Sequence, residues 1–310
     1  MCFMYAASAD SMTRGEAIAG LAALGALPVM PALSPPNGAK AENNGREYTA
    51  IVGCTALGGD DLSPIVDATI LIRKNRIEAI GPRASVKIPA SAHRISANGM
   101  FAIPGLIDSH VHFFQSGGLY TRPDAIDLRA VRPYTDELRW IKSNLHDTFA
   151  RYIRAGITSV VDAGGPFWNY DVRAQAAQML LAPRVMAAGP LISSVERRIL
   201  DPYNDPPIVK IDAPEAARTL IDRELAAHTD YVKFWWVLSP DRPAAAFQPI
   251  ARAAIEYAHQ RGARVIVHAT ELETARLAVE SGTDILAHSV FDADIDDAFL
   301  DLVKSRNVIY

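Results

Sequence analysis

The sequence predicts an α/β fold: a (β/α)8 TIM-type barrel that is incomplete and ends in strand 7, with a small N-terminal β-sandwich domain. After Pro104, near-continuous apolar strands alternate with amphipathic helices, which is typical of a parallel sheet covered by helices. Polar residues recur at the C-terminal ends of these strands, where such barrels place their chemistry. A doubly wound sheet is the alternative, but no glycine-rich phosphate loop follows the first strand.

The composition is that of an ordinary globular protein. The 310 residues are 49% hydrophobic and carry a net charge of −4, with a pI near 6.1. No run of Lys or Arg could follow a phosphate backbone, so nucleic acid is not an expected partner. The two cysteines, Cys2 and Cys54, exclude a disulfide framework and a cysteine-rich zinc module.

Residues 1–41 have the pattern of a signal peptide. Arg14 precedes an apolar stretch from Ala17 to Val29, and the small-x-small triplet at 39–41 predicts cleavage after Ala41. The alternative is an amphipathic or disordered N-terminal arm. The apolar part is too short and too interrupted to span a membrane. We therefore expect a periplasmic or secreted protein without a membrane span.

Residues 42–103 have the texture of a small β domain. Short strands are predicted at 48–52, 68–72 and 76–80, and Gly, Asn and Pro residues mark the turns between them. No cluster of titratable residues occurs in this segment. We expect it to have a structural role.

Residues 104–310 contain the barrel elements. A first strand ends at the His-x-His of residues 110–112. Glycines, prolines and acidic caps mark the ends of the helices, including Asp212 before Pro214 and a capping box at Thr270–Glu273. Further strands are predicted at 156–161, 184–188, 231–236, 264–268, 284–288 and 307–310, and helices at 171–181, 212–227, 247–260, 270–281 and 294–305.

His110 and His112 end the first barrel strand. Side chains alternate faces along a strand, so both imidazoles point the same way. Neutral imidazole is a common ligand of zinc and similar ions, but two ligands are too few for a site. Lys233, His268 and His288 occupy equivalent positions at the ends of later strands. Each taken singly is more often a buried, hydrogen-bonded residue than a ligand.

Four motifs in order resemble the metal-dependent amidohydrolase superfamily, and most closely its imidazolonepropionase-like branch, which includes prolidase-type peptidases. The resemblance covers roughly residues 47 to 310, and the ordered set is specific where each motif alone is weak. The motifs are Pro104 to Phe113 (PGLIDSHVHF), Tyr231 to Phe234 (YVKF), Val265 to His268 (VIVH) and Ile285 to His288 (ILAH).

The resemblance implies a binuclear site with two divalent ions, with zinc the ion that the donors suit best. It implies that His110 and His112 bind the more buried metal and that His268 and His288 bind the second. Lys233 would bridge the two as a carbamate formed with carbon dioxide. A free ammonium group has no lone pair for a cation, whereas a carbamate presents two anionic oxygens. A lysine in an apolar strand has a lowered pKa suited to this reaction.

The chain departs from the family pattern at its C-terminal end. The family's metal-binding and proton-shuttling aspartate at the end of strand 8 has no counterpart, because only 207 residues follow Ile103 and such barrels take about 250. Asp284, in a Gly-Thr-Asp triplet, precedes its strand and belongs at the opposite end of the barrel. Asp162 is a closer candidate, although a loop hydrogen-bond acceptor is the more ordinary role. We expect a fragment whose open sheet edges favour a homo-oligomer.

The function expected from the resemblance is hydrolysis of a C–N bond in a small molecule: an amide, a cyclic amide or a dipeptide-like substrate. One alternative is an inactive remnant that binds metal or a partner. Another is a single-metal deaminase or imidazolonepropionase-type enzyme, against which Lys233 argues. Trp168, Trp235 and Trp236 could line an apolar substrate pocket, but at least one of the adjacent pair is expected to pack in the core.

Overall fold

The computed structural model describes residues 3–6, 47–58, 62–115, 118–120, 126–197, 200–201, 203–240 and 242–310. The chain divides into two compact units, Met1–Gly105 and Leu106–Tyr310. Residues 7–41 of the predicted signal segment 1–41 lie outside the described residues, so the signal stays a prediction, whereas residues 3–6 form a short strand that pairs with Met100–Ile103. Among the described residues, no helix is long and apolar enough to cross a membrane.

The first unit is built on one mixed sheet in the order β1-β6-β2-β3-β4, with β5 paired to β2. The long strand β2 carries register shifts on either side of Cys54, so one part of it pairs with β5 and the next part with β6. The second sheet of the predicted sandwich stays a prediction. The strands are β1 (Phe3–Ala6), β2 (Tyr48–Leu57), β3 (Pro64–Arg73), β4 (Arg76–Pro82), β5 (His93–Ser96) and β6 (Met100–Ile103).

The second unit has two parallel sheets, β7-β8-β9 and β11-β10-β12-β13-β14. The chain passes from one sheet to the other between β9 and β10, where the Ala188 amide donates to the Asp162 carbonyl at 3.1 Å. The strands are β7 (Leu106–Val111), β8 (Ile157–Asp162), β9 (Arg184–Ala187), β10 (Leu191–Ser193), β11 (Ile208–Lys210), β12 (Val232–Trp235), β13 (Val265–His268) and β14 (Ile285–Leu286).

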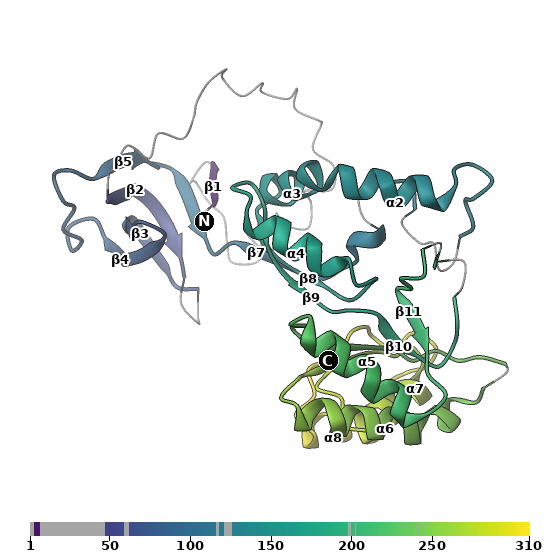
Figure 1. The fold of residues 1–310 in the computed structure, drawn as a ribbon. Coiled ribbons are helices and arrows are strands. Elements are labelled where there is room, and N and C mark those ends of the chain that lie inside the picture. The colour runs from purple at the N-terminus through teal and green to yellow at the C-terminus, as the bar shows by residue number, and fades with distance from the viewer. Residues whose placement is uncertain are drawn as a thin grey trace. The chain divides into compact units, whose positions relative to one another are not determined.

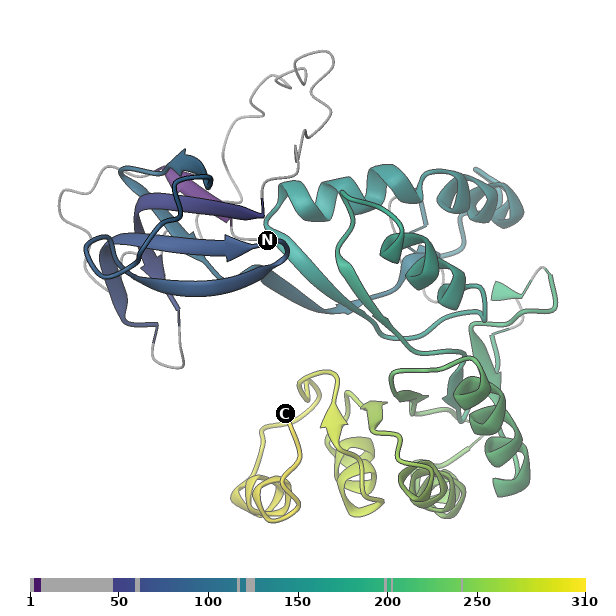
Figure 2. The same ribbon diagram turned by 60° about the vertical axis from the view of Figure 1, so that its left-hand side comes forward.

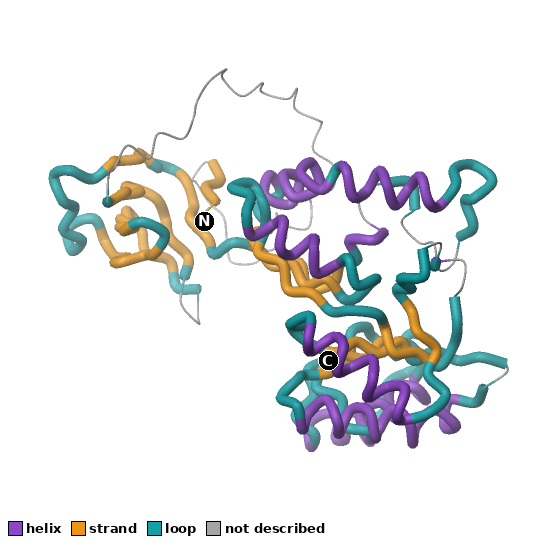
Figure 3. Tube along the Cα trace, in the orientation of Figure 1, coloured by secondary structure: helices purple, strands orange, loops and turns teal. Residues whose placement is uncertain are grey.

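Helices cover the outer sides of both sheets in the second unit. Figures 1 and 2 show α2, α3 and α4 on the side of β7–β9 that faces away from the other sheet, and α5 to α8 on the far side of β10–β14. Figure 3 shows strands and helices alternating from β11 onward. The helices are α2 (Tyr134–Ser143), α3 (Leu145–Arg154), α4 (Asn169–Ala177), α5 (Pro214–Ala226), α6 (Ala244–Gln260), α7 (Leu272–Glu280) and α8 (Asp297–Ser305), with a short 3-10 turn, η2 (Phe113–Gln115).

The side chains of β12 alternate between two faces of the sheet, one packed in the core and the other directed away from it. Val232, Phe234 and Trp236 belong to a large apolar core that includes residues of α5, α6 and α7. Side chains at the intervening positions point to the opposite side of the sheet. Lys233 and Trp235 are therefore directed away from this core.

Several local expectations were wrong. Ala213, not Asp212, is the N-cap residue of α5, and the Asp212 carboxylate pairs with Arg242 at 3.2 Å. The capping box at 270–273 does not form: Glu271 is the N-cap residue of α7, and Asp292 from the following loop accepts the Leu272 amide at 2.9 Å. Helices α2 and α3 were not predicted. The expected last strand is a single parallel bridge between Ile285 and Ile309.

Candidate metal centre

His110 and His112 converge at the end of β7. Both rings are partly buried, and their Nε2 atoms lie 3.3 Å apart. Two nitrogens that bind one tetrahedral zinc ion, at about 2.0–2.1 Å each, are separated by roughly the same distance. The pair can therefore share a cation or a proton.

A backbone carbonyl orients His112. Its Nδ1 atom lies 2.7 Å from the carbonyl oxygen of Gly164, in the loop that follows β8. A carbonyl only accepts, so Nδ1 carries the hydrogen and Nε2 of the neutral ring keeps its lone pair. This second contact sets the ring in the orientation and tautomer that a metal ligand needs.

His268 and His288 lie in the same cluster. The ring centroid of His288 is 4.5 Å from that of His110 and 4.5 Å from that of His268. His268 ends β13, and His288 follows β14 by two residues. The structure thus brings together four histidines from three strand ends.

Lys233 is buried beside them. Its side chain is 1% exposed, and its Nζ atom has no hydrogen-bond partner among the described residues. Burial lowers the pKa of Lys233 to about 7, although the charge of Asp162 opposes the shift. Burial also lowers the pKa of His110 to about 2, with further contributions from the charges of Lys233, His112 and His288. Mutual repulsion among potential cations marks a site that favours lone pairs over protons.

Asp162, the last residue of β8, is fully buried near Lys233. Its carboxylate accepts the backbone amides of Phe113 at 3.3 Å and Gly164 at 3.2 Å. Burial raises its pKa well above the usual value, while these two hydrogen bonds and the charge of Lys233 oppose the shift. The expected role as a loop acceptor is present, in a place that joins the loops after β7 and β8.

The other acidic candidates have structural partners. The Asp284 carboxylate accepts the amide of Val265, the first residue of β13, at 2.7 Å and lies 2.9 Å from His259. This places it at the opposite end of the strand from His268, as expected. Asp296 caps α8 by accepting the Phe299 amide at 2.7 Å.

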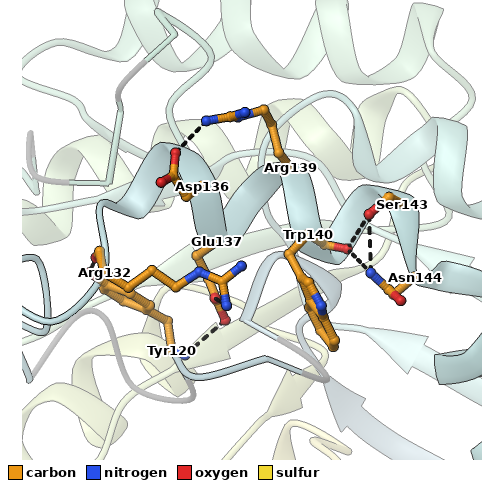
Figure 4. Close-up of polar contacts among 8 residues, drawn as sticks. All are labelled: Tyr120, Arg132, Asp136, Glu137, Arg139, Trp140, Ser143 and Asn144. Atoms are coloured by element: carbon orange, nitrogen blue, oxygen red, sulfur yellow. Dashed lines mark hydrogen bonds and ion pairs between the residues drawn. The ribbon is translucent and has the colours of Figure 1, made fainter.

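Glu137 on α2 organises the first strand-to-helix loop and was missed by sequence reasoning. It is fully buried, and its Oε1 accepts the amide of Tyr120 at 3.1 Å. Oε2 lies 3.3 Å from the Arg132 guanidinium, an ion pair without hydrogen-bond geometry. Figure 4 shows both partners around this carboxylate. An acidic residue on a helix is usually solvated, so the sequence gives no sign that Glu137 is buried.

An apolar wall adjoins the histidine cluster. Trp235 belongs to it, and the Trp235 ring centroid is 6.0 Å from that of His268. Trp168 packs against the same wall, whereas Trp236 is fully buried against Phe247, as expected for one of the adjacent pair. The buried members of the wall are Tyr120, Tyr134, Leu138, Leu191, Val195, Leu200, Ile208 and Trp235.

The histidines alone do not complete a donor set for a divalent cation. In the ranges that the structure describes, no three His, Cys, Asp or Glu side chains form a metal-binding group by themselves. The buried, unpartnered Nζ of Lys233 is the further donor at hand. As an ammonium it would repel a cation, so the fit requires a neutral or anionic form of this side chain.

Comparisons with known proteins agree with this architecture. The amidohydrolase family model matches residues 101–299. An imidazolonepropionase from Saccharopolyspora erythraea is 26% identical over 268 residues, which are 79% of this chain and 63% of that protein. Phenylurea hydrolase B matches with a TM-score of 0.68 and 18% identity, covering 84% of this chain and 64% of its own. A Xaa-Pro dipeptidase structure with bound methionine matches with a TM-score of 0.63 and 19% identity, covering 84% and 65%.

The two structural likenesses show a TIM-barrel-type α/β fold. The chain spans less than two thirds of the length of each of these three proteins. The family match covers more than half of this chain and includes all four motifs at 104–113, 231–234, 265–268 and 285–288. The chain therefore belongs to the amidohydrolase family, in the imidazolonepropionase-like branch of that superfamily.

Proposed function

We propose that this chain carries the metal centre of a hydrolase that cleaves C–N bonds in small molecules, such as amides, cyclic amides or dipeptides. The observation that carries the proposal is Lys233: a fully buried lysine whose Nζ has no hydrogen-bond partner in the described part of the chain, beside four clustered histidines. An uncompensated buried amine is costly, so it persists where a ligand or a modification uses it.

His110, His112, Lys233, His268 and His288 would hold two divalent ions, zinc being the ion that these donors suit best. When bound, such ions activate water and polarise the carbonyl to be attacked. The family membership and the donor set support this assignment.

Lys233 would take part as a carbamate. The neutral amine attacks carbon dioxide through its lone pair, a new C–N bond forms, and one amine proton leaves to solvent. A pKa of about 7 leaves a large neutral fraction of Lys233 at neutral pH.

Two alternatives come from the family pattern. One is an inactive remnant that binds metal or a partner without turnover. A single-metal imidazolonepropionase-type or deaminase-type enzyme is the other, but it gives no role to the buried amine of Lys233.

Hydrolysis of a panel of dipeptides, N-acyl amino acids and cyclic amides tests the proposal. The protein is prepared with zinc and bicarbonate, with a chelated sample and Lys233→Ala as comparisons. We expect turnover of at least one class of substrate, and its loss on chelation and on the substitution. Turnover that survives both changes would contradict the proposal, and metal binding without turnover would support the remnant.

We also propose a periplasmic or secreted location, on the pattern of residues 1–41. Expression of the full sequence in a bacterium and N-terminal sequencing of the exported fraction test it. A mature N-terminus at Glu42 is expected, and intact chain confined to the cytoplasm would count against export.

A further inference from the structure

A cationic side chain lies beside the histidine cluster. Arg197 follows β10 by four residues, and its guanidinium carbon is 5.1 Å from the centroid of the Trp235 ring. The same indole is 6.0 Å from the ring of His268. The indole ring of Trp235 therefore lies next to both the guanidinium group of Arg197 and the candidate metal centre.

The charge of Arg197 has no carboxylate partner in the described part of the chain. Its one hydrogen bond there is from Nη1 to the carbonyl oxygen of Glu196 at 2.9 Å. Two other arginines of this unit are compensated by carboxylates: Arg242 pairs with Asp212 at 3.2 Å and Arg173 pairs with Asp230 at 2.8 Å. Most of the five N–H donors of Arg197 thus remain to bind an anion.

The surroundings of Arg197 suit an amphipathic ligand. Val195, Leu200 and Trp235 are buried members of the apolar wall that adjoins the cluster. A guanidinium group stacked on an indole keeps its planar edge available for a carboxylate, which it can bind through two parallel hydrogen bonds. A ligand with an apolar part and a carboxylate could pack its apolar part against Trp235 and pair its carboxylate with Arg197.

We propose that Arg197 binds a carboxylate group of the substrate, and that the side chain of Trp235 lies between that group and the metal centre. The substrate class is then an N-acyl amino acid or a dipeptide with a free carboxylate, in preference to a neutral amide or a urea. This inference rests on the proposed function for its meaning. Binding tests it separately from turnover.

The probes are N-acetyl-L-phenylalanine and its neutral carboxamide, titrated by calorimetry into zinc-loaded protein and into Lys233→Ala. The acid is expected to bind at least about tenfold more tightly than the carboxamide. Arg197→Met should abolish this preference, and Arg197→Lys should reduce it. Arg223→Lys is the matched control. Arg223 lies on helix α5, and its guanidinium carbon is likewise stacked on an aromatic ring, 4.5 Å from the ring centroid of Phe167.

Equal binding of acid and carboxamide to the parent protein, or no saturable binding of the acid, would overturn the inference. So would a preference that persists in Arg197→Met. A preference for the acid that depends on Arg197 in a protein without turnover would support the carboxylate site while contradicting the proposed hydrolase. Circular dichroism of each variant shows that its fold is retained.

Discussion

The Nδ1 atom of His112 and the carbonyl oxygen of Gly164 are 2.7 Å apart. This contact joins the end of β7 to the loop after β8 and directs the Nε2 atom of His112 toward that of His110. Gly164 has a φ of +103°, and a Cβ atom there would lie 2.8 Å from the Gly189 carbonyl oxygen and from Leu191 Cδ1. Only glycine fits this position.

Gly164→Ala should therefore weaken metal binding and destabilise the fold. The added methyl group must move the carbonyl that orients His112, and loss of such a contact typically costs 10- to 100-fold in metal affinity. Stability should fall by about 1–3 kcal/mol. Competition titration with a zinc chelator and urea unfolding measure the two effects.

Gly262→Ala is the matched control, because its φ is +79° but nothing lies within 4 Å of the added Cβ. It should lose stability by about 1 kcal/mol from backbone strain and keep its zinc affinity. Equal zinc affinities for the Gly164 and Gly262 variants would show that the Gly164 carbonyl does not orient a ligand.

Glu137→Ala should destabilise the second unit by about 2–4 kcal/mol, because it leaves the Tyr120 amide and the Arg132 guanidinium without their partner. Asp136→Ala, on the same helix, removes a more exposed ion pair with Arg139 and should change stability by less than about 1 kcal/mol. Figure 4 shows the two pairs side by side. Urea unfolding of both variants tests this difference, and similar losses would argue that Glu137 is not the buried anchor of this loop.

Glu224→Gln should stabilise the protein increasingly as pH rises. Glu224 is fully buried on α5, neither carboxylate oxygen has a hydrogen-bond partner among the described residues, and burial raises its pKa well above 4.5. At pH values between 4.5 and the raised pKa of Glu224, the folded state binds more protons than the unfolded state. The parent therefore loses stability as pH rises through that window. Glutamine has no charge to bury.

The free energy of unfolding of Glu224→Gln and its parent, measured from pH 4 to pH 8, checks this prediction. The variant should gain more than about 1 kcal/mol over the parent at the upper end and little at the lower end. Glu256→Gln, at an exposed position of α6, is the matched control and should not gain this stability. A constant difference for Glu224→Gln would mean that Glu224 is solvated or paired.

The sequence predicted the features that depend on the period of a strand. The period of two in β12 placed Lys233 on the face opposite Val232 and Phe234, and His-x-His brought two ring nitrogens to within 3.3 Å. The adjacent tryptophans separate for the same reason, Trp236 into the core and Trp235 into the wall beside His268. Alternation is a local property, so local sequence is enough to read it.

Features that depend on contacts distant in sequence could not be read in this way. Asp292 caps α7 from 20 residues away, and Asp212 is drawn from its predicted cap by Arg242. Glu137 and Glu224 are acidic residues on helices, where a solvated position is the usual expectation. Their burial depends on which segments pack over them, and the hydrophobic periodicity of the helix does not predict that packing.

Metal content per chain shows whether Lys233 and the four histidines form a divalent metal centre. The parent and Lys233→Ala are purified with bicarbonate and added zinc, dialysed, and analysed by elemental mass spectrometry beside circular dichroism. About two ions are expected per parent chain, falling to one or none in the variant with the fold retained. A folded parent that retains no zinc, or a Lys233→Ala variant that retains as much as the parent, would contradict this assignment.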